Sequence, residues 1–364
     1  MARSSSTKRV AALGLMSGTS LDGIDVAAID SDGETQITIG PALTIPYPVD
    51  FRERLRGILG GVGDIAAVEA ELTRLHAAAA GEFRARHPDV RIELIGFHGH
   101  TVLHEPEKGR TWQIGDGALL AQLTGCDVVA DFRGADVAAG GEGAPLAPLY
   151  HAALAANLEK PLAVLNLGGV GNVTWIGPGD IEDGDIMAFD TGPGNAMLDD
   201  WAARHTGQTA DFGGALARRG QVSEPHVARF LASSYFAKSP PKSLDRDAFA
   251  AFTPQELSAA DGAATLTEMA ASAVAAARMH FPRPAREFLV TGGGRHNPAL
   301  MAVLTRLLGV SARPVEAVGW DGDALEAQAF AYLAIRSVRG LSLSLPTTTG
   351  VPGPTQGGRL FKAG

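Results

Sequence analysis

The stretch GLMSGTSLDGIDVAAID, residues 14–30, joins two apolar runs through a turn rich in Gly, Ser, Thr and Asp. Val10 to Ser17 and Gly23 to Asp30 are predicted to be strands, because apolar residues dominate the first run and alternate in the second. Glycine has no Cβ to keep an anion away, so the N–H groups and hydroxyls of such a turn can hold a phosphate. The same composition is typical of a plain hairpin. Other segments must decide between the two.

The other half of the chain opens with the same pattern. Residues 162–177, LAVLNLGGVGNVTWIG, again form an apolar run, a glycine turn and a second apolar run. A third glycine segment, TGGG at 291–294, follows an apolar run and precedes a helix pattern. The P-loop pattern G-x-x-x-x-G-K-[ST] does not occur in the sequence. Together the three glycine segments predict a nucleotide held by two related lobes.

Strand and helix patterns alternate along the rest of the chain, which predicts an α/β fold. Asp64 to His87 has helical spacing, with Asp64 as N-cap and Pro88 as the stop. Ala263 to Phe281 predicts a long Ala-rich helix, and residues 321–338 predict an amphipathic one. The Gly/Ala/Pro-rich segment 135–148 is a candidate domain junction.

Composition excludes several classes of protein. Acidic residues outnumber basic ones, 40 to 31, and no basic cluster is long enough to follow a nucleic-acid backbone. Cys126 is the single cysteine, which excludes an intramolecular disulfide and a Cys-based zinc site and favours the cytoplasm. No apolar run reaches the length of a membrane span. The basic start is interpreted as a short disordered lead and not as a secretory signal.

Eight motifs, in order, resemble those of the 1,6-anhydro-N-acetylmuramic acid kinases, a family of the actin, Hsp70 and sugar-kinase superfamily. They are GLMSGTSLDGID (14–25), FHGHT (97–101), QIGDG (113–117), ADFRGADVAAGGEGAPL (130–146), NLGGVGNVT (166–174), FDTGPGN (189–195), PPKS (240–243) and TGGGRHN (291–297). The chain departs from the family pattern at Glu142, where Gln is more usual, and at Leu244-Asp245, where Thr-Gly is more usual.

The resemblance implies a two-lobed actin-like ATPase (ribonuclease H-like) fold with an ATP cleft between the lobes. The first lobe is expected to comprise residues 1–130, with a C-terminal helix at about 322–340 packing back on it, and the second lobe residues 131–321. The implied activity is an ATP-dependent kinase that opens 1,6-anhydro-N-acetylmuramic acid with water and phosphorylates O6. The implied setting is cell-wall recycling in the bacterial cytoplasm, and a homodimer is left open.

The resemblance assigns ATP and its Mg²⁺ to the glycine segments. The expected phosphate- and ATP-binding residues are Gly18, Thr19, Ser20, Leu21, Asp22, Gly23, Ile24 and Asp25 in the first turn, Gly168, Gly169 and Asn172 in the second, and Gly292, Gly293 and Gly294 in the third. Asp25 enters a buried strand and needs a polar partner, for which Mg²⁺-bound water is one candidate.

Asp190 ends an apolar run and precedes two glycines that flank a proline. Most aspartates in such places cap a helix or form a turn. The resemblance instead implies that Asp190 is the catalytic base and acts on water. Helix N–H groups close to it are expected to lower its pKa and keep it ionised.

Five residues are candidates for the sugar site: His98, Gln113, Arg133, Glu142 and Glu326. Arg133 suits the lactyl carboxylate of a muramic acid, although a surface ion pair with Asp131 or Asp136 is an equal alternative. Trp112 beside Gln113 fits either a pyranose platform or a core position. For Glu326 a simple exposed position on the last helix stays open.

Two rival classes of function stay open at this stage. His98, His100 and His104 follow a strand as His-x-His, as in some metal-dependent hydrolases, although such sites need further His and Asp ligands. A non-catalytic, nucleotide-driven module would keep the glycine turns but would not need Asp190.

Overall fold

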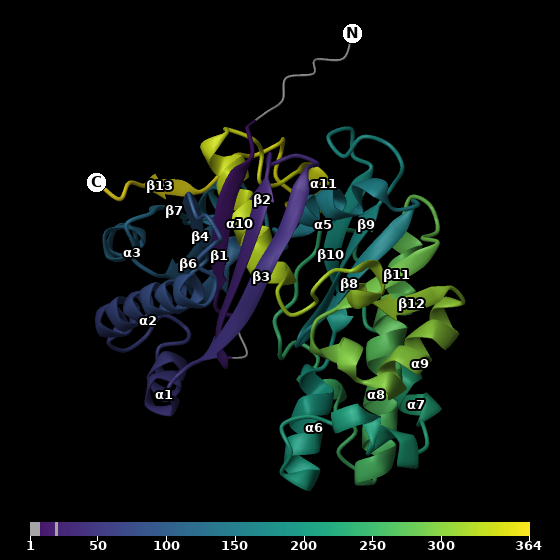
Figure 1. Ribbon diagram of the computed structural model, residues 1–364. Coiled ribbons are helices and arrows are strands. Elements are labelled where there is room, and N and C mark those ends of the chain that lie inside the picture. The colour runs from purple at the N-terminus through teal and green to yellow at the C-terminus, as the bar shows by residue number, and fades with distance from the viewer. Residues whose placement is uncertain (1–7, 19–20) are drawn as a thin grey trace. The chain divides into compact units, whose positions relative to one another are not determined.

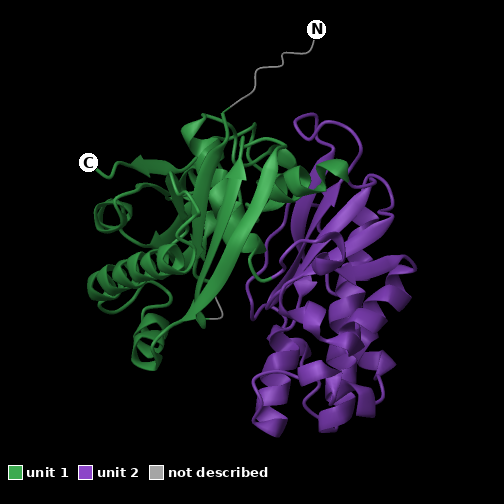
Figure 2. Ribbon diagram, viewed as in Figure 1, with its two compact units in different colours: residues 1–157, 323–364 green, residues 158–322 purple. Residues whose placement is uncertain are grey.

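The computed structural model describes residues 8–18 and 21–364 of the chain. The chain divides into two compact units (Figure 2). Unit 1 comprises residues 1–157 and 323–364, and unit 2 comprises residues 158–322. Each unit has its own sheet and its own hydrophobic core.

Unit 1 is built on a six-stranded sheet in the order β13-β7-β4-β1-β2-β3 (Figure 1). The strands are β1 (Val10–Met16), β2 (Gly23–Ser31), β3 (Ile37–Pro46), β4 (Leu94–Phe97), β7 (Asp127–Ala130) and β13 (Arg359–Phe361), with a separate hairpin of β5 (His100–Glu105) and β6 (Arg110–Ile114). The helices are α1 (Val49–Gly57), α2 (Ile65–Arg86), α3 (Gly117–Thr124), α4 (Gly134–Ala138), α5 (Pro148–Leu154), α10 (Leu325–Val338) and α11 (Pro346–Thr349).

The first strand pair is the predicted one, and β1 and β2 run antiparallel from Val10↔Ser31 to Met16↔Asp25. Side chains alternate between the faces of a strand. Leu13 and Leu15 therefore join the core formed with α1 and α2, whereas Gly14 between them faces α10. Helices thus cover both faces of this sheet.

The predicted helix at 64–87 is confirmed as α2. The Asp64 side chain caps it by accepting the Ala67 N–H at 3.2 Å. The helix ends at Arg86, and its buried residues lie on one stripe that faces the sheet. The cap and the apolar spacing together account for its start and its orientation.

The last helix differs from the prediction. Residues 325–338 are helical, as expected, but α10 is buried around most of its surface and is not amphipathic. The Arg336 guanidinium lies inside and donates to the carbonyls of Ser342 at 2.6 Å and Gly33 at 2.8 Å. Arg336 is therefore a buried charge whose hydrogen bonds are satisfied by protein carbonyls, and it does not indicate a solvent-exposed face of the helix.

The expected boundary at 130/131 lies inside unit 1. Residues 131–157 stay with this unit because backbone and side-chain bonds hold them to its C-terminal segment. The Glu142 N–H donates to the Thr349 carbonyl at 2.7 Å, and the Thr349 hydroxyl donates to buried Asp136 at 2.6 Å. The division falls instead between Asn157 and Leu158.

Unit 2 repeats the connectivity of unit 1 in a five-stranded sheet, β10-β9-β8-β11-β12. Its strands are β8 (Leu162–Leu167), β9 (Val170–Ile176), β10 (Ile186–Pro193), β11 (Glu287–Thr291) and β12 (Ser311–Pro314). Its helices are α6 (Ala196–Thr206), α7 (Glu224–Leu231), α8 (Ala259–Ala277) and α9 (Pro298–Leu308). The predicted helix at 263–281 is α8, which begins earlier and gives way to a 3₁₀ turn at Arg278–His280.

The five strands of the unit 2 sheet match five of the six strands of the unit 1 sheet. In unit 1, β1-β2-β3 are antiparallel neighbours, and β1, β4 and β7 are parallel neighbours. In unit 2, β8-β9-β10 are antiparallel neighbours, and β8, β11 and β12 are parallel neighbours. This duplication confirms the expectation of two related lobes. In the described part of the chain, no helix combines the length and the apolar character needed to cross a membrane.

Candidate active site

The turn between β1 and β2 is held by backbone contacts. Leu21 adopts a φ of +58° and its N–H donates to the Gly18 carbonyl at 3.2 Å, while the Asp22 carbonyl accepts the Tyr47 N–H at 3.0 Å. A Cβ on Gly23 would lie 2.4 Å from the Ile45 carbonyl oxygen, so packing requires glycine there. Leu21 and Ile24 bury their side chains in the core and offer a ligand only backbone groups. Thr19 and Ser20 lie outside the described residues.

Asp25 is a partly buried carboxylate on β2. The Thr44 hydroxyl donates to it at 2.6 Å. Burial is the largest cause that raises its pKa to about 6; the Thr44 bond opposes the rise, and the negative charges of Asp22, Glu326 and Asp323 add to it. The negative charge around Asp25 suits a Mg²⁺ ion held through water, since no three of these carboxylates in the described residues are arranged to bind it directly.

Asp25→Asn is expected to stabilise unit 1 at pH 8 relative to wild type, by about 1–3 kcal/mol, and to have little effect at pH 4. The pKa of this carboxyl is higher in the folded state than in the unfolded state. The folded state therefore binds more protons between about pH 4 and 6, and wild type loses stability as the pH rises through that window.

Urea unfolding of both proteins across pH 4–8 measures the difference, with exposed Asp89→Asn as the control. A stability difference between Asp25→Asn and wild type that does not change with pH would contradict the assignment.

Buried His98 pairs with half-buried Arg133. Arg133 Nε donates to His98 Nε2 at 3.1 Å, and His98 Nδ1 donates to the Gly99 carbonyl at 2.9 Å. Burial and the Arg133 charge together hold the pKa of His98 well below its usual range. The ring is therefore neutral, and the Nε2 lone pair that a metal would need is already in use.

Arg133 also donates through Nη1 to the Gly143 carbonyl at 2.7 Å, and its guanidinium lies over the Phe330 ring. Neither of its hydrogen bonds uses Nη2. The charge of Glu326, at the start of α10, acts on both Arg133 and Asp25. Glu326 is exposed in the structure. Within unit 1 the predicted site residues Arg133 and Asp25 are therefore both close enough to Glu326 to feel its charge.

Gln113 and Trp112 point to opposite sides of the β5–β6 hairpin, as neighbours on a strand do. Gln113 donates to the hydroxyls of Thr111 at 2.8 Å and Thr101 at 3.2 Å. His104, on the same side, lies close enough to Arg133 and Glu142 for their charges to act on its pKa. Gln113 and Glu142 therefore share a region with Arg133.

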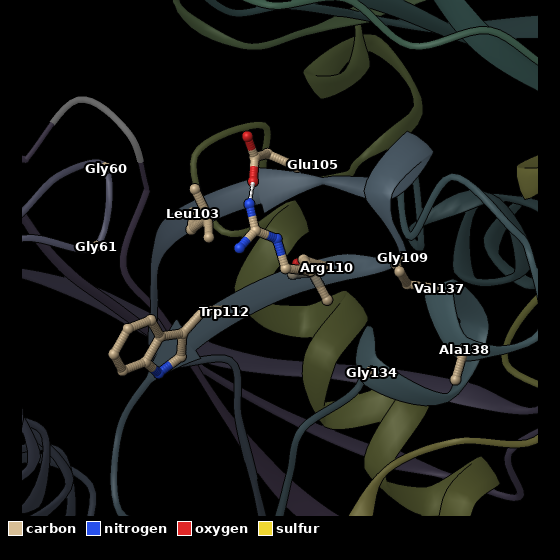
Figure 3. A pocket seen from close by; sticks show the side chains of 11 residues that line it. Gly60, Gly61, Leu103, Glu105, Gly109, Arg110, Trp112, Gly134, Val137 and Ala138 are labelled. Atoms are coloured by element: carbon tan, nitrogen blue, oxygen red, sulfur yellow. Dashed lines mark hydrogen bonds and ion pairs between the residues drawn. The ribbon is translucent and has the colours of Figure 1, made fainter.

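Trp112 is 41% exposed and so is not a core residue. It lines a pocket of about 630 Å³ between the hairpin, the residues before α2 and helix α4 (Figure 3). Its ring atoms lie 3.7 Å from the place of a Cβ on Gly61. The pocket wall also includes Leu103 and Val137, with Arg110 paired to Glu105.

His100 is hydrogen-bonded within unit 1. Its Nδ1 lies 2.9 Å from the Ser17 hydroxyl, which accepts the Tyr47 hydroxyl at 2.7 Å. Burial lowers the pKa of His100 to about 4. His104 Nδ1 lies 3.0 Å from the Thr111 hydroxyl. Across residues 8–18 and 21–364, no group of three or more His, Cys, Asp or Glu side chains is arranged to hold a metal.

The second glycine turn, between β8 and β9, has no packing reason for its glycines. A Cβ on Gly168 or Gly169 would meet no atom closer than 3.6 Å. Their carbonyls accept the N–H groups of Asn195 at 2.7 Å and Gly194 at 2.9 Å, which tie the turn to the start of α6. Asn172 pairs with Asn166 across the strands. An open turn with a fixed backbone suits the close approach of a phosphate.

The third glycine segment divides into structural and open positions. Gly292 has a φ of +76°, and a Cβ there would lie 2.3 Å from Asn166 Oδ1. A Cβ on Gly294 would lie 2.6 Å from that of Leu167. At Gly293 the nearest atom would be 3.7 Å away. Packing therefore explains two of these glycines and leaves Gly293 as the open one.

Asp190 lies at a bulge of β10, where its pairing with β9 shifts register. Its carboxylate Oδ2 accepts the Leu244 N–H at 2.8 Å. Its backbone N–H donates to the Lys242 carbonyl at 3.0 Å, and its carbonyl accepts the Tyr235 hydroxyl at 2.6 Å. The sequence predicted that helix N–H groups would lie close to the Asp190 carboxylate. The N–H group that donates to it at 2.8 Å belongs to Leu244, which is not in a helix.

Tyr235, Lys242, Ser17 and Tyr47 were not predicted as site residues. The motif PPKS, residues 240–243, was the only sequence signal for Lys242. Ser17 directly precedes the first glycine turn, which was the available signal there. Neither tyrosine lies in a recognisable pattern.

Comparison with known proteins extends over nearly the whole chain. The family model described as anhydro-N-acetylmuramic acid kinase matches residues 10–363. A protein of that name from Paramagnetospirillum magneticum is 58% identical and covers 96% of this chain and 98% of its own length. Another from Rhodospirillum rubrum is 54% identical, with 97% and 94% covered.

Solved structures resemble this one more distantly. The activator of the 2-hydroxyisocaproyl-CoA dehydratase from Clostridium difficile, with bound ADPNP, has a TM-score of 0.46 at 12% identity, covering 91% of this chain and 96% of its own. The ROK hexokinase from Thermus thermophilus has a TM-score of 0.40 at 18% identity, covering 89% and 99%.

Proposed function

The chain belongs to the anhydro-N-acetylmuramic acid kinase family, and from this premise we propose that it opens 1,6-anhydro-N-acetylmuramic acid with water and phosphorylates O6. The enzyme is a sugar kinase that uses ATP. The product would be N-acetylmuramic acid 6-phosphate. The observation that carries the proposal is the Asp190 carboxylate, held at the β10 bulge by the Leu244 N–H.

The substrate dictates the order of bond changes. In the anhydro sugar, O6 is bound to C1 and has no proton to lose. Water therefore attacks C1 while Asp190 accepts its proton, and the C1–O6 bond breaks. O6 takes the γ-phosphoryl group as the bond from the γ-phosphorus to its bridging oxygen breaks, and ADP leaves. A general base in this role contributes about 10²–10⁴ to the rate.

Backbone groups of the glycine turns are proposed to hold the ATP phosphates. Gly168, Gly169 and Gly293 support this assignment, because packing does not require glycine at any of them. Asp25 would hold Mg²⁺ through water, with Asp22, Asp323 and Glu326 adding negative charge. The ion neutralises phosphate charge when it is bound.

The sugar is proposed to lie against the His98–Arg133 pair. Arg133 Nη2 is directed to the lactyl carboxylate, since the guanidinium is already oriented by His98 and Gly143. The neutral His98 ring keeps the guanidinium in place, and Gln113 and Glu142 would contact the sugar hydroxyls or the amide. These roles follow from the charge and position of the side chains.

The proposed setting is peptidoglycan recycling in the cytoplasm, where ATP is available. Cys126 is free and buried, as suits a reducing compartment.

Incubating the purified protein with Mg-ATP and a panel of sugars tests this function. The panel contains the anhydro muramic acid, its analogue without the lactyl group, and the reducing sugar, with products identified by mass spectrometry. We expect one ADP per sugar phosphate and a product heavier than the anhydro sugar by one phosphoryl group (HPO₃) and one water. ATP hydrolysis without any sugar product would support a nucleotide-driven module. A stoichiometric transition metal essential for activity would support the hydrolase alternative.

A further inference from the structure

Lys242 is a lysine in an unusual place, with only 3% of its surface exposed. A buried ammonium needs partners, and the structure provides carbonyls and aromatic faces. Nζ donates to the carbonyls of Tyr235 at 3.0 Å and Phe236 at 3.4 Å. It also lies 4.6 Å from the centre of the Tyr235 ring and 5.6 Å from that of Phe189.

Two of these partners, Phe189 and Tyr235, adjoin Asp190, whereas Nζ also lies 3.4 Å from His280 Nε2 on another segment. Phe189 is the neighbour of Asp190 on β10, and the Tyr235 hydroxyl donates to the Asp190 carbonyl at 2.6 Å. The carbonyl of Lys242 itself accepts the Asp190 N–H at 3.0 Å. Two residues further on, the Leu244 N–H donates to the Asp190 carboxylate at 2.8 Å.

The ammonium therefore joins the two ends of one loop. Residues 235 and 236 form one end and residues 242–244 the other, and both ends bond to Asp190. Burial, with a smaller effect from the Lys238 charge, lowers the pKa of Lys242 to about 8. The lowered pKa reflects the unfavourable desolvation of the ammonium.

We propose that Lys242 is a positioning residue for Asp190, whose ammonium fixes the loop that orients the carboxylate toward the attacking water. The inference rests on the proposed function, because it takes Asp190 as the base. Packing alone does not explain why a charge is buried here, since a Met side chain would fill the same space without a desolvation cost. A positioning role for the ammonium does explain it.

Lys242→Met is expected to lower kcat about 10- to 100-fold while leaving the KM for ATP within about twofold. A shift of the base by an ångström costs a factor of this size, whereas the glycine turns are elsewhere in the chain. Tyr235→Phe removes the hydroxyl bond to Asp190 and is expected to cost about 3- to 10-fold in kcat. Exposed Lys238→Met is the matched control and is expected to keep wild-type rates.

The decisive comparison uses the Asp190→Asn background. If Lys242 acts through Asp190, Lys242→Met lowers the residual rate of Asp190→Asn by less than about twofold. An equal loss in both backgrounds would mean a general structural role and would overturn the inference. Thermal unfolding of each variant shows whether the protein is folded. If Lys242→Met does not fold, the same comparison is made with Tyr235→Phe.

Failure of the inference and of the proposed function are distinguishable. Wild-type protein that phosphorylates no anhydro sugar overturns the function. A wild type that is active beside an equally active Lys242→Met overturns only the role of Lys242.

Discussion

Asp190→Asn is expected to lower kcat by about 10²–10⁴-fold while leaving ATP binding nearly unchanged. The asparagine keeps the size of the side chain, and its Oδ1 can still accept the Leu244 N–H. It cannot take a proton from water, so only the chemical step suffers. Steady-state kinetics give kcat, and a direct ATP-binding titration gives the affinity.

Asp200→Asn is the control, because this carboxylate is exposed on α6 and pairs with Arg246 at the surface. It is expected to retain wild-type turnover. An Asp190→Asn protein within tenfold of wild type would remove Asp190 from the role of base.

Gly14→Ala is expected to destabilise unit 1 by about 3 kcal/mol or more, or to prevent folding. A Cβ on Gly14 would lie 1.7 Å from the Ala327 carbonyl oxygen, and one on its β4 partner Gly96 would lie 2.1 Å from that of Phe330. The two glycines let the α10 backbone rest directly on the sheet. The helix cannot move away without opening the core on which it packs.

Gly81→Ala is the matched control, since Gly81 lies inside α2 and a Cβ there would meet nothing within 4 Å. Alanine favours a helix over glycine, so this variant is expected to be more stable by about 0.5–1 kcal/mol. Urea unfolding compares both with wild type. A Gly14→Ala protein as stable as wild type would refute the close packing of α10.

The strand pairs and the duplicated architecture were predictable, because apolar alternation and glycine turns are local signals. The burial of α10 was not. Its Ala-rich sequence with Glu326 and Arg336 reads as an amphipathic helix, and only the contacts of Arg336 with Gly33 and Ser342 reveal an interior position. A charge that is satisfied by distant carbonyls has no signature in the order of residues.

The same limit applies to the candidate site. In the sequence the glycines of all three turns look equivalent, whereas the structure finds packing reasons for Gly23 and Gly292 and none for Gly168. Lys242 reads as a surface lysine, although it is buried beside the Asp190 loop. Such distinctions depend on residues far apart in the chain, which a motif cannot describe.

The fate of water during turnover tests the central claim most directly. The reaction is run in ¹⁸O-water and stopped early, because the free anomeric hydroxyl exchanges slowly with solvent, and unlabelled product in the same water corrects for that exchange. If Asp190 directs water to C1, the label appears on the anomeric oxygen of the sugar 6-phosphate and the phosphoryl group gains none. Label on the transferred phosphoryl group would mean that water attacked ATP first, and would contradict coupled ring opening and phosphorylation.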